Sequence, residues 1–168
     1  DLPNWRASIG YVPQEVYLFS DTISNNISFS KSISDNDEDA VKFAAKAAQV
    51  YSNIAEFPQG FETRVGERGI TLSGGQKQRI SIARAIIKNP KILIFDDCLS
   101  AVDTETEEKI LTNLKSIMED RTTIIISHRV SSVKHCDEIL VLDDGKILER
   151  GAHDELIHAR GSYYEIHE

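Results

Sequence analysis

The sequence is poor in cysteine and in positive charge, and it has no long hydrophobic run. Two cysteines, Cys98 and Cys136, provide neither a disulfide framework nor a cluster of metal ligands, which favours a reducing compartment. Nineteen basic residues against twenty-seven acidic ones leave a formal net charge of −8. This balance argues against broad binding to nucleic acid or to anionic lipid, because both require a basic surface. No apolar run approaches the ~20 residues of a membrane span.

The remaining composition is that of a globular protein. The 168 residues are 40% hydrophobic and 27% charged, which is enough apolar material for a real core in one domain of ordinary size. The N-terminal residues have no signal-peptide character. The chain begins without methionine, in an apparent linker that leads into the first expected strand.

Hydrophobic patterning predicts alternating strands and helices in the second half of the chain. The runs 8–13, 91–95 and 122–127 indicate strands, and the last two are apolar on both faces, as is typical of buried parallel strands. Asp143-Asp144-Gly145 indicates a hairpin between 139–142 and 147–148. Helices are expected at 37–49, 51–56, 76–88, 104–118, 130–134 and 154–159, whereas 14–33 is polar and irregular. The sequence therefore predicts an α/β fold with a mostly parallel sheet and a helical insertion over 34–69.

The first candidate site is Leu72-Ser73-Gly74-Gly75-Gln76, which leads directly into the 76–88 helix. A serine and two glycines at a helix N-terminus offer backbone N–H groups, a hydroxyl and the positive end of the helix dipole, which suit a phosphate. A plain N-cap with glycine turn residues is the alternative interpretation.

The second candidate site is the acid pair Asp96-Asp97 at the end of the 92–95 run. Ligands of parallel sheets bind beyond the carboxyl ends of the strands, where the first carboxylate could hold Mg²⁺ and the second could polarise a water. The alternative is a strand that simply ends in an acidic turn. His128 and Gln14 follow other expected strands, and either could be merely structural.

Taken together and in order, these residues resemble a known family. Gln14, 72–76, 96–97, 100–103 and His128 resemble the Q-loop, signature motif, Walker B strand, D-loop and H-loop of the nucleotide-binding domain of ABC ATPases. The resemblance implies a partial P-loop NTPase (RecA-like) core with a helical subdomain, and ATP and Mg²⁺ as cofactors. It implies three segments: 1–33 with the Q-loop, 34–89 with the signature helix, and 90–168 with the remaining core motifs and a C-terminal tail.

The resemblance also implies a role for each matched residue. The expected catalytic residues are Asp97, His128 and Gln14, and the expected metal ligands are Asp96 and Gln14. The residues expected to bind nucleotide are Leu72, Ser73, Gly74, Gly75, Gln76 and Asp103.

The same resemblance also indicates which type of ABC protein the chain is similar to. Val65-Gly66-Glu67-Arg68-Gly69 is similar to the loop through which exporters contact their transmembrane helices, so Glu67 and Arg68 are expected to couple to a membrane domain. This implies an exporter of drugs or lipids, at the cytoplasmic face of the cell membrane. Its expected partners are a second nucleotide-binding domain and transmembrane domains of the same chain, and not nucleic acid. A solvated charge pair is the simpler interpretation of Glu67 and Arg68.

Two departures from the family pattern modify this expectation. The P-loop pattern G-x-x-x-x-G-K-[ST] is absent, because Gly145-Lys146 is followed by Ile147 and is preceded by Leu140 where the first glycine would stand. We therefore expect a C-terminal fragment of a longer transporter, which alone would neither bind ATP tightly nor hydrolyse it.

The second departure is Asp97, where the family usually has glutamate. The carboxylate is one methylene shorter, and this resembles the weak-site member of heterodimeric exporters. Two other interpretations are a soluble ABC ATPase of DNA repair or translation, and a short non-enzymatic product that only binds a partner through its signature and D-loop faces.

Overall fold

The chain folds into two compact units. The structure, a computed structural model, describes residues 2–29, 37–66 and 69–167. The first unit is Asp1–Ile126 and the second is Ser127–Glu168. No helix in the described ranges has both the length and the apolar character that crossing a membrane requires. The three segments expected from the family pattern remain a prediction, because they divide the chain by motif and not by contacts.

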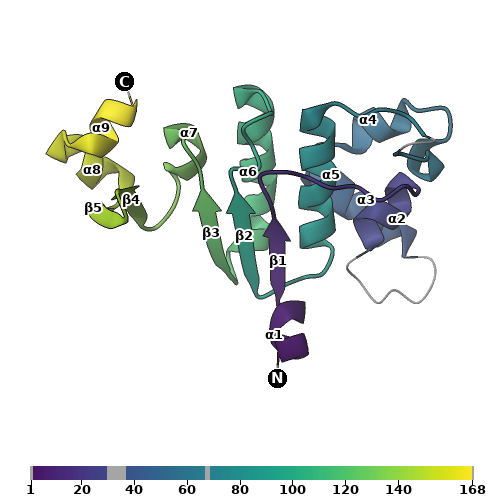
Figure 1. Cartoon of the computed structure of the whole chain (residues 1–168), viewed down its shortest axis with the longest axis horizontal. Helices are drawn as coiled ribbons and strands as arrows, with labels where there is room; N and C mark the ends of the chain where they lie inside the picture. The colour runs from purple at the N-terminus through teal and green to yellow at the C-terminus, as the bar shows by residue number, and fades with distance from the viewer. Residues whose placement is uncertain (1, 30–36, 67–68, 168) are drawn as a thin grey trace. The chain divides into compact units, whose positions relative to one another are not determined.

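A three-stranded parallel sheet forms the centre of the first unit (Figure 1). Its strands are β1 (Ile9–Val12), β2 (Ile92–Asp96) and β3 (Thr122–Ile126), in the order β1-β2-β3. The register pairs Val12 with Phe95, and Asp96 with Ile126. The parallel sheet is confirmed, with β2 as its central strand. Leu93 and Phe95 of β2 are buried on one face, and its alternate residues are half-buried on the other.

One side of this sheet carries the hydrophobic core. Val12, Leu93 and Phe95 point into it and are almost fully buried. They join a cluster that includes α5 (Gly74–Ile86) and α6 (Thr104–Met118), whose Ile110 and Leu114 are also buried. Because the amphipathic helix α6 presents its apolar stripe to the strands, the sheet and the helix exclude water from each other.

The opposite side of the sheet is partly open. Tyr11, Ile124 and Ile126 are 52%, 47% and 49% exposed. The prediction that 122–127 is buried on both faces is therefore wrong for β3. Alternate side chains of a strand point to opposite faces, and the buried core lies on one face only.

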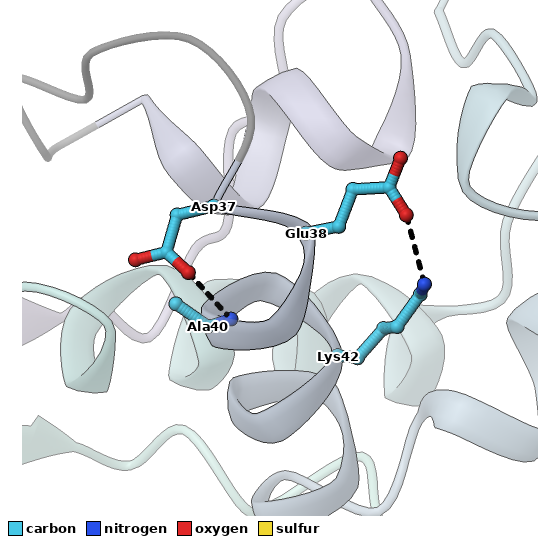
Figure 2. Close-up of polar contacts among 4 residues, drawn as sticks. All are labelled: Asp37, Glu38, Ala40 and Lys42. Carbon is cyan, nitrogen blue, oxygen red and sulfur yellow. Dashed lines mark hydrogen bonds and ion pairs between the residues drawn. The ribbon is translucent and has the colours of Figure 1, made fainter.

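Helix α3 (Glu38–Ala47) confirms the helix expected from residue 37. Figure 2 shows how it begins: Asp37 Oδ1 accepts a hydrogen bond from the Ala40 N–H at 3.1 Å, and Lys42 Nζ lies 2.8 Å from Glu38 Oε2. The cap satisfies one of the N–H groups that a helix leaves unpaired in its first turn. Val41, at the same helix face as the following alanines, is buried against the core.

Two helices of the first unit occur where the sequence predicts none. Helix α1 (Leu2–Ala7) replaces the expected linker, and α2 (Ile23–Ser28) lies within the stretch expected to be irregular. Thr22 Oγ1 caps α2 by accepting the Asn25 N–H at 3.0 Å, and Ile23 and Ile27 are fully buried. These elements have only six residues each, so they are too short for a periodic pattern to reveal them.

The other helices of the first unit agree more closely with the prediction. Helix α4 is Tyr51–Ala55, and the 3₁₀ turn η1 is Gly60–Glu62. Helix α5 begins at Gly74 and not at Gln76, because Ser73 serves as its N-cap. Helices α2 and α3 pack on α5 on the β1 side of the sheet, and α4 packs on α3 (Figure 1).

The second unit is a hairpin with small helices. Strands β4 (Ile139–Asp143) and β5 (Lys146–Gly151) pair antiparallel through the left-handed residues Asp144 and Gly145, which confirms the hairpin. Helix α7 is Val130–Val133 and α8 is His153–Ala159, both as expected. Helix α9 (Ser162–His167) is an addition. The Glu149 carboxylate caps it by accepting the N–H groups of Ser162 and Tyr163 at 2.7 and 3.0 Å.

Candidate nucleotide-binding site

The predicted polar residues of β1 and β2 meet at one edge of the sheet. Gln14 Nε2 donates a hydrogen bond to Asp97 Oδ2 at 3.2 Å, and the Tyr11 hydroxyl donates to Asp96 Oδ2 at 2.9 Å. Parallel strands place their carboxyl ends side by side, so residues 83 positions apart in the chain become partners. Each of the two carboxylates is therefore oriented by a residue from or just after β1.

The backbone of Asp97 is held in the left-handed region, with φ 44°. Its N–H donates to Ile126 O at 2.8 Å, and its own carbonyl accepts the Ser100 hydroxyl at 2.9 Å. Asp and Asn tolerate this backbone conformation better than most other residues. The sharp turn fixes the direction of the Asp97 carboxylate as the chain leaves β2.

Asp96 and Gln14 supply oxygen atoms of the kind that Mg²⁺ prefers. Because Gln14 Nε2 is engaged by Asp97, its Oε1 is the amide atom that can face a cation. Within the described ranges, no three His, Cys, Asp or Glu side chains gather as a metal centre. The site fits Mg²⁺ of the kind held by one or two side chains together with substrate phosphates and water.

The first turn of α5 is built to leave its backbone accessible. Ser73 Oγ accepts the Gln76 N–H at 3.2 Å, and the Gln76 side chain accepts the Ser73 N–H at 2.9 Å. This capping box confirms that the serine acts as an N-cap, and the binding of a phosphate here stays a prediction. The N–H groups of Gly74 and Gly75 belong to the first turn, which has no intrahelical acceptors. The motif suits an anionic group such as a phosphate.

The glycines also permit a close approach to the following loop. A Cβ on Gly75 would lie 3.0 Å from Ala101 O, whereas one on Gly74 would lie 3.6 Å from the Ala101 Cβ. Gln78, on the buried side of α5, accepts the Ala101 N–H at 3.2 Å. The loop 99–103 therefore packs directly on the signature helix.

Asp103, at the end of that loop, is the N-cap of α6. Its Oδ1 accepts the Thr106 N–H at 2.9 Å, and this hydrogen bond lowers the pKa of the Asp103 carboxyl. The carboxylate is exposed and charged. Leu72, the remaining residue of the predicted nucleotide set, is buried and anchors the start of the motif in the core.

Several predicted residues are not joined to this site by the structure. His128 follows β3, but it belongs to the second unit, where it is exposed. Glu67 and Arg68 lie outside the described residues. Cys98, next to Asp97, is buried, and burial raises the pKa of its thiol to about 12, so it is not a nucleophile at neutral pH.

Sequence reasoning missed Tyr11 and Gln78. Tyr11 lies in a strand where an aromatic residue is ordinary, so no local signal marks it. Gln78 could have been noticed, because it is a polar residue at a buried position of an otherwise apolar helix face.

The first unit thus combines a parallel sheet that has carboxylates at one edge with a serine-capped helix, and comparison with known proteins identifies its family. Residues 1–100 match the family model described as ABC transporter. The chain belongs to this family. Domains of the family bind ATP, typically with Mg²⁺.

Individual relatives give a narrower comparison. The chain is 53% identical over 167 residues to the uncharacterized ABC transporter ATP-binding protein YknU of Bacillus subtilis, covering 99% of this chain and 28% of that protein. It is 48% identical over 161 residues to the ATM1-type heavy metal exporter of Novosphingobium aromaticivorans, covering 96% of this chain and 26% of that protein.

A solved structure agrees with these sequence matches. A bacterial Atm1-family ABC exporter with ATP bound superposes with a TM-score of 0.88 at 47% identity, covering 96% of this chain and 28% of that one. The α/β fold is thus that of an exporter nucleotide-binding domain. The chain spans between a quarter and a third of the length of these three proteins.

Proposed function

We propose that the chain is the ATP-binding motor portion of an ABC exporter. The observation that carries this proposal is the hydrogen bond from Gln14 to Asp97 beside Asp96, at the carboxyl edge of the parallel sheet. This contact supports the proposal because Asp96 and Asp97 then lie at the edge where such sheets bind ligands. The hydrolysis of ATP would supply the free energy that drives transport.

Each residue of the edge has a distinct role in this proposal. Asp96 and Gln14 Oε1 would hold Mg²⁺, and the Asp97 carboxylate would polarise a water and accept its proton. Gln14 Nε2 keeps that carboxylate oriented before the reaction. His128, which the structure does not join to this edge, stays a predicted hydrogen-bonding partner of phosphate or of the water.

The signature motif acts on a second nucleotide. Ser73, Gly74 and Gly75 present backbone N–H groups and the positive helix end to the phosphates of an ATP held by another nucleotide-binding domain. Asp103 and the loop 99–103 belong to the same face of the pair, because Gln78 and Gly75 hold that loop on α5.

The proposed partners follow from this arrangement and from the relatives. They are a second nucleotide-binding domain and transmembrane domains, which Glu67 and Arg68 contact, so the motor works at the cytoplasmic face of the membrane. Two relatives are named as exporters, and the net charge of −8 does not suit nucleic acid.

A heterodimeric partner is favoured because the site of Asp97 is weakened while the signature is intact. One missing methylene withdraws the carboxylate by about 1 Å, and misplacement on this scale can lower a rate by about 10²-fold. The slow site would hold Asp97, and the fast site of the partner would use Ser73, Gly74 and Gly75 of this chain.

The Mg²⁺ assignment is tested by Asp96→Asn in the full natural polypeptide with its partner. Because the substitution removes a charged ligand and keeps the side-chain size, Mg²⁺-dependent binding of ATP at this site should weaken at least about tenfold. Asp144→Asn in the exposed hairpin turn is the matched control, and it should bind as the wild type does. Equal binding by both variants would refute the proposed site.

The weak-site assignment is tested by Asp97→Glu. Turnover at this site should rise by about tenfold or more when the carboxylate reaches further. Glutamate is less suited to φ 44°, so Asp144→Glu, at φ 43°, measures the backbone cost of the same change. If turnover does not increase while the protein stays folded, the heterodimer proposal is wrong.

A further inference from the structure

One arginine connects the segment after Gln14 to the signature helix. Arg84, on α5, donates hydrogen bonds to Asn26 O from Nε at 2.7 Å and to Asn26 Oδ1 from Nη2 at 2.9 Å. Its Nη1 donates to Tyr17 O at 3.0 Å, and its guanidinium lies over the Phe19 ring at 5.5 Å from the centroid. The planar guanidinium therefore binds the loop and helix α2 simultaneously.

Asn26 makes this connection rigid. It is 1% exposed, and its Nδ2 donates to Phe19 O at 3.0 Å and to Thr22 O at 2.9 Å. Its Oδ1 accepts the Phe19 N–H at 2.9 Å in addition to Arg84. Because each polar atom of this buried amide is matched, any separation of α5 from 17–19 would leave buried groups without partners.

This network lies between two functional motifs along the chain. Tyr17 lies three residues after Gln14, and α5 begins at the Ser73 cap. The backbone therefore leads from Gln14, the partner of Asp97, to the 17–19 segment bound by Arg84, and helix α5 leads from Arg84 back to the signature motif. Under the proposed function these motifs belong to different ATP sites, one on this chain and one completed by the partner.

We infer that Arg84 is a positioning residue that transmits the state of Gln14 at one nucleotide site to the signature motif at the other. This inference rests on the proposed function. A lysine cannot replace Arg84. The planar guanidinium reaches two backbone carbonyls and one side-chain amide oxygen at once, whereas the compact ammonium of lysine cannot. Displacement of the 17–19 segment then moves α5, and the first-turn N–H groups move with it.

A double-mutant cycle in the full natural polypeptide with its partner tests the transmission. Gln14→Ala and Arg84→Gln should each lower kcat about fivefold with little change in KM, and the double variant should be no more than about twofold worse than either. Arg121→Gln is the matched control. Arg121 donates to Pro90 O at 2.9 Å and to Asn89 Oδ1 at 3.0 Å, so it makes the same kind of arginine–asparagine contact away from both motifs.

The control separates transmission from general loss of stability. Arg121→Gln should lower the unfolding temperature as Arg84→Gln does, but its effect on kcat should multiply with that of Gln14→Ala. Multiplying effects of Gln14→Ala and Arg84→Gln would overturn the inference while leaving the proposed function intact. If the unsubstituted protein and its partner do not turn over ATP, the proposed function fails and the inferred transmission fails with it.

A second measurement needs no nucleotide and uses a milder variant. Arg84→Lys should accelerate hydrogen exchange of the Phe19 amide about tenfold, because Asn26 Oδ1 loses the guanidinium that holds it in place. Arg121→Gln should leave this amide unchanged. Unchanged Phe19 exchange in Arg84→Lys would show that Arg84 does not hold the segment, and this also overturns the inference.

Discussion

Alanine substitution of the two signature glycines should separate stability from function. Gly74 and Gly75 occupy the first turn of α5, and neither has a positive φ, so alanine is compatible with both backbones. An alanine at such a site stabilises by about 0.4–1 kcal/mol, because it restricts the unfolded chain. The structure distinguishes the two positions only by what the new Cβ meets.

For Gly74→Ala the nearest atom lies at 3.6 Å, an ordinary van der Waals distance. The full gain is expected, which corresponds to about 1–4 °C in unfolding temperature for a chain of this size. For Gly75→Ala the Cβ lies 3.0 Å from Ala101 O, so the loop 99–103 must shift by a few tenths of an ångström. This shift should cancel some or all of the gain.

The ATP turnover of these two variants should not follow their stability. Both methyl groups occupy space that an approaching phosphate needs, so both variants should lower ATP turnover by about 10- to 100-fold. Gly74→Ala would then be more stable and less active than the wild type. Thermal unfolding and steady-state turnover of the full natural polypeptide with its partner measure the two effects. A stabilised Gly74→Ala with full turnover would refute the idea that the exposed backbone of this turn binds phosphate.

Three other outcomes follow from single contacts. The hydrogen bond from the Thr106 N–H lowers the pKa of Asp103, so the cap stabilises α6 fully above the ordinary aspartate pKa of about 4 and is lost as pH falls through the lowered pKa. Asp103→Ala should therefore make the stability depend less on pH in this range, as measured by acid unfolding followed by circular dichroism. With a pKa of about 12, Cys98 is only about 10⁻⁴ thiolate at pH 8, so iodoacetamide should label it in urea and not in the native state; rapid native labelling would contradict the burial. Tyr11→Phe frees the Asp96 carboxylate to rotate and should raise the Mg²⁺ concentration for half-maximal ATP binding a few-fold, whereas an unchanged Mg²⁺ titration would show that the hydroxyl does not position Asp96.

Local patterns were sufficient for the longer regular elements. The apolar run of β2 predicted a central parallel strand, and the acids and periodic leucines and isoleucines of 104–118 predicted α6 at its observed bounds. Ser73 and the glycines identified a helix start, because capping depends on neighbours within one turn. The order of the motifs also identified the family, since each motif is a short stretch of chain.

Long-range contacts were beyond any local pattern. Nothing near Asn26 shows that its amide would be buried under Arg84, and α2 is too short to have a period of its own. The exposure of Ile126 in β3 likewise depends on which elements pack on that face of the sheet. A run of isoleucines gives the same sequence pattern whether one face of the strand or both faces are covered.

The sequence by itself determined the chemistry at the site: two carboxylates after a strand, a glutamine after another, and a glycine-rich helix start. Only the tertiary structure decided which of these groups meet. Parallel pairing of β1 with β2 brings Gln14 to Asp97 across 83 residues, and helix packing binds the next segment to α5 through Arg84. The reason is physical, because hydrogen bonds between distant segments depend on strand register and side-chain packing, which the whole fold establishes at once.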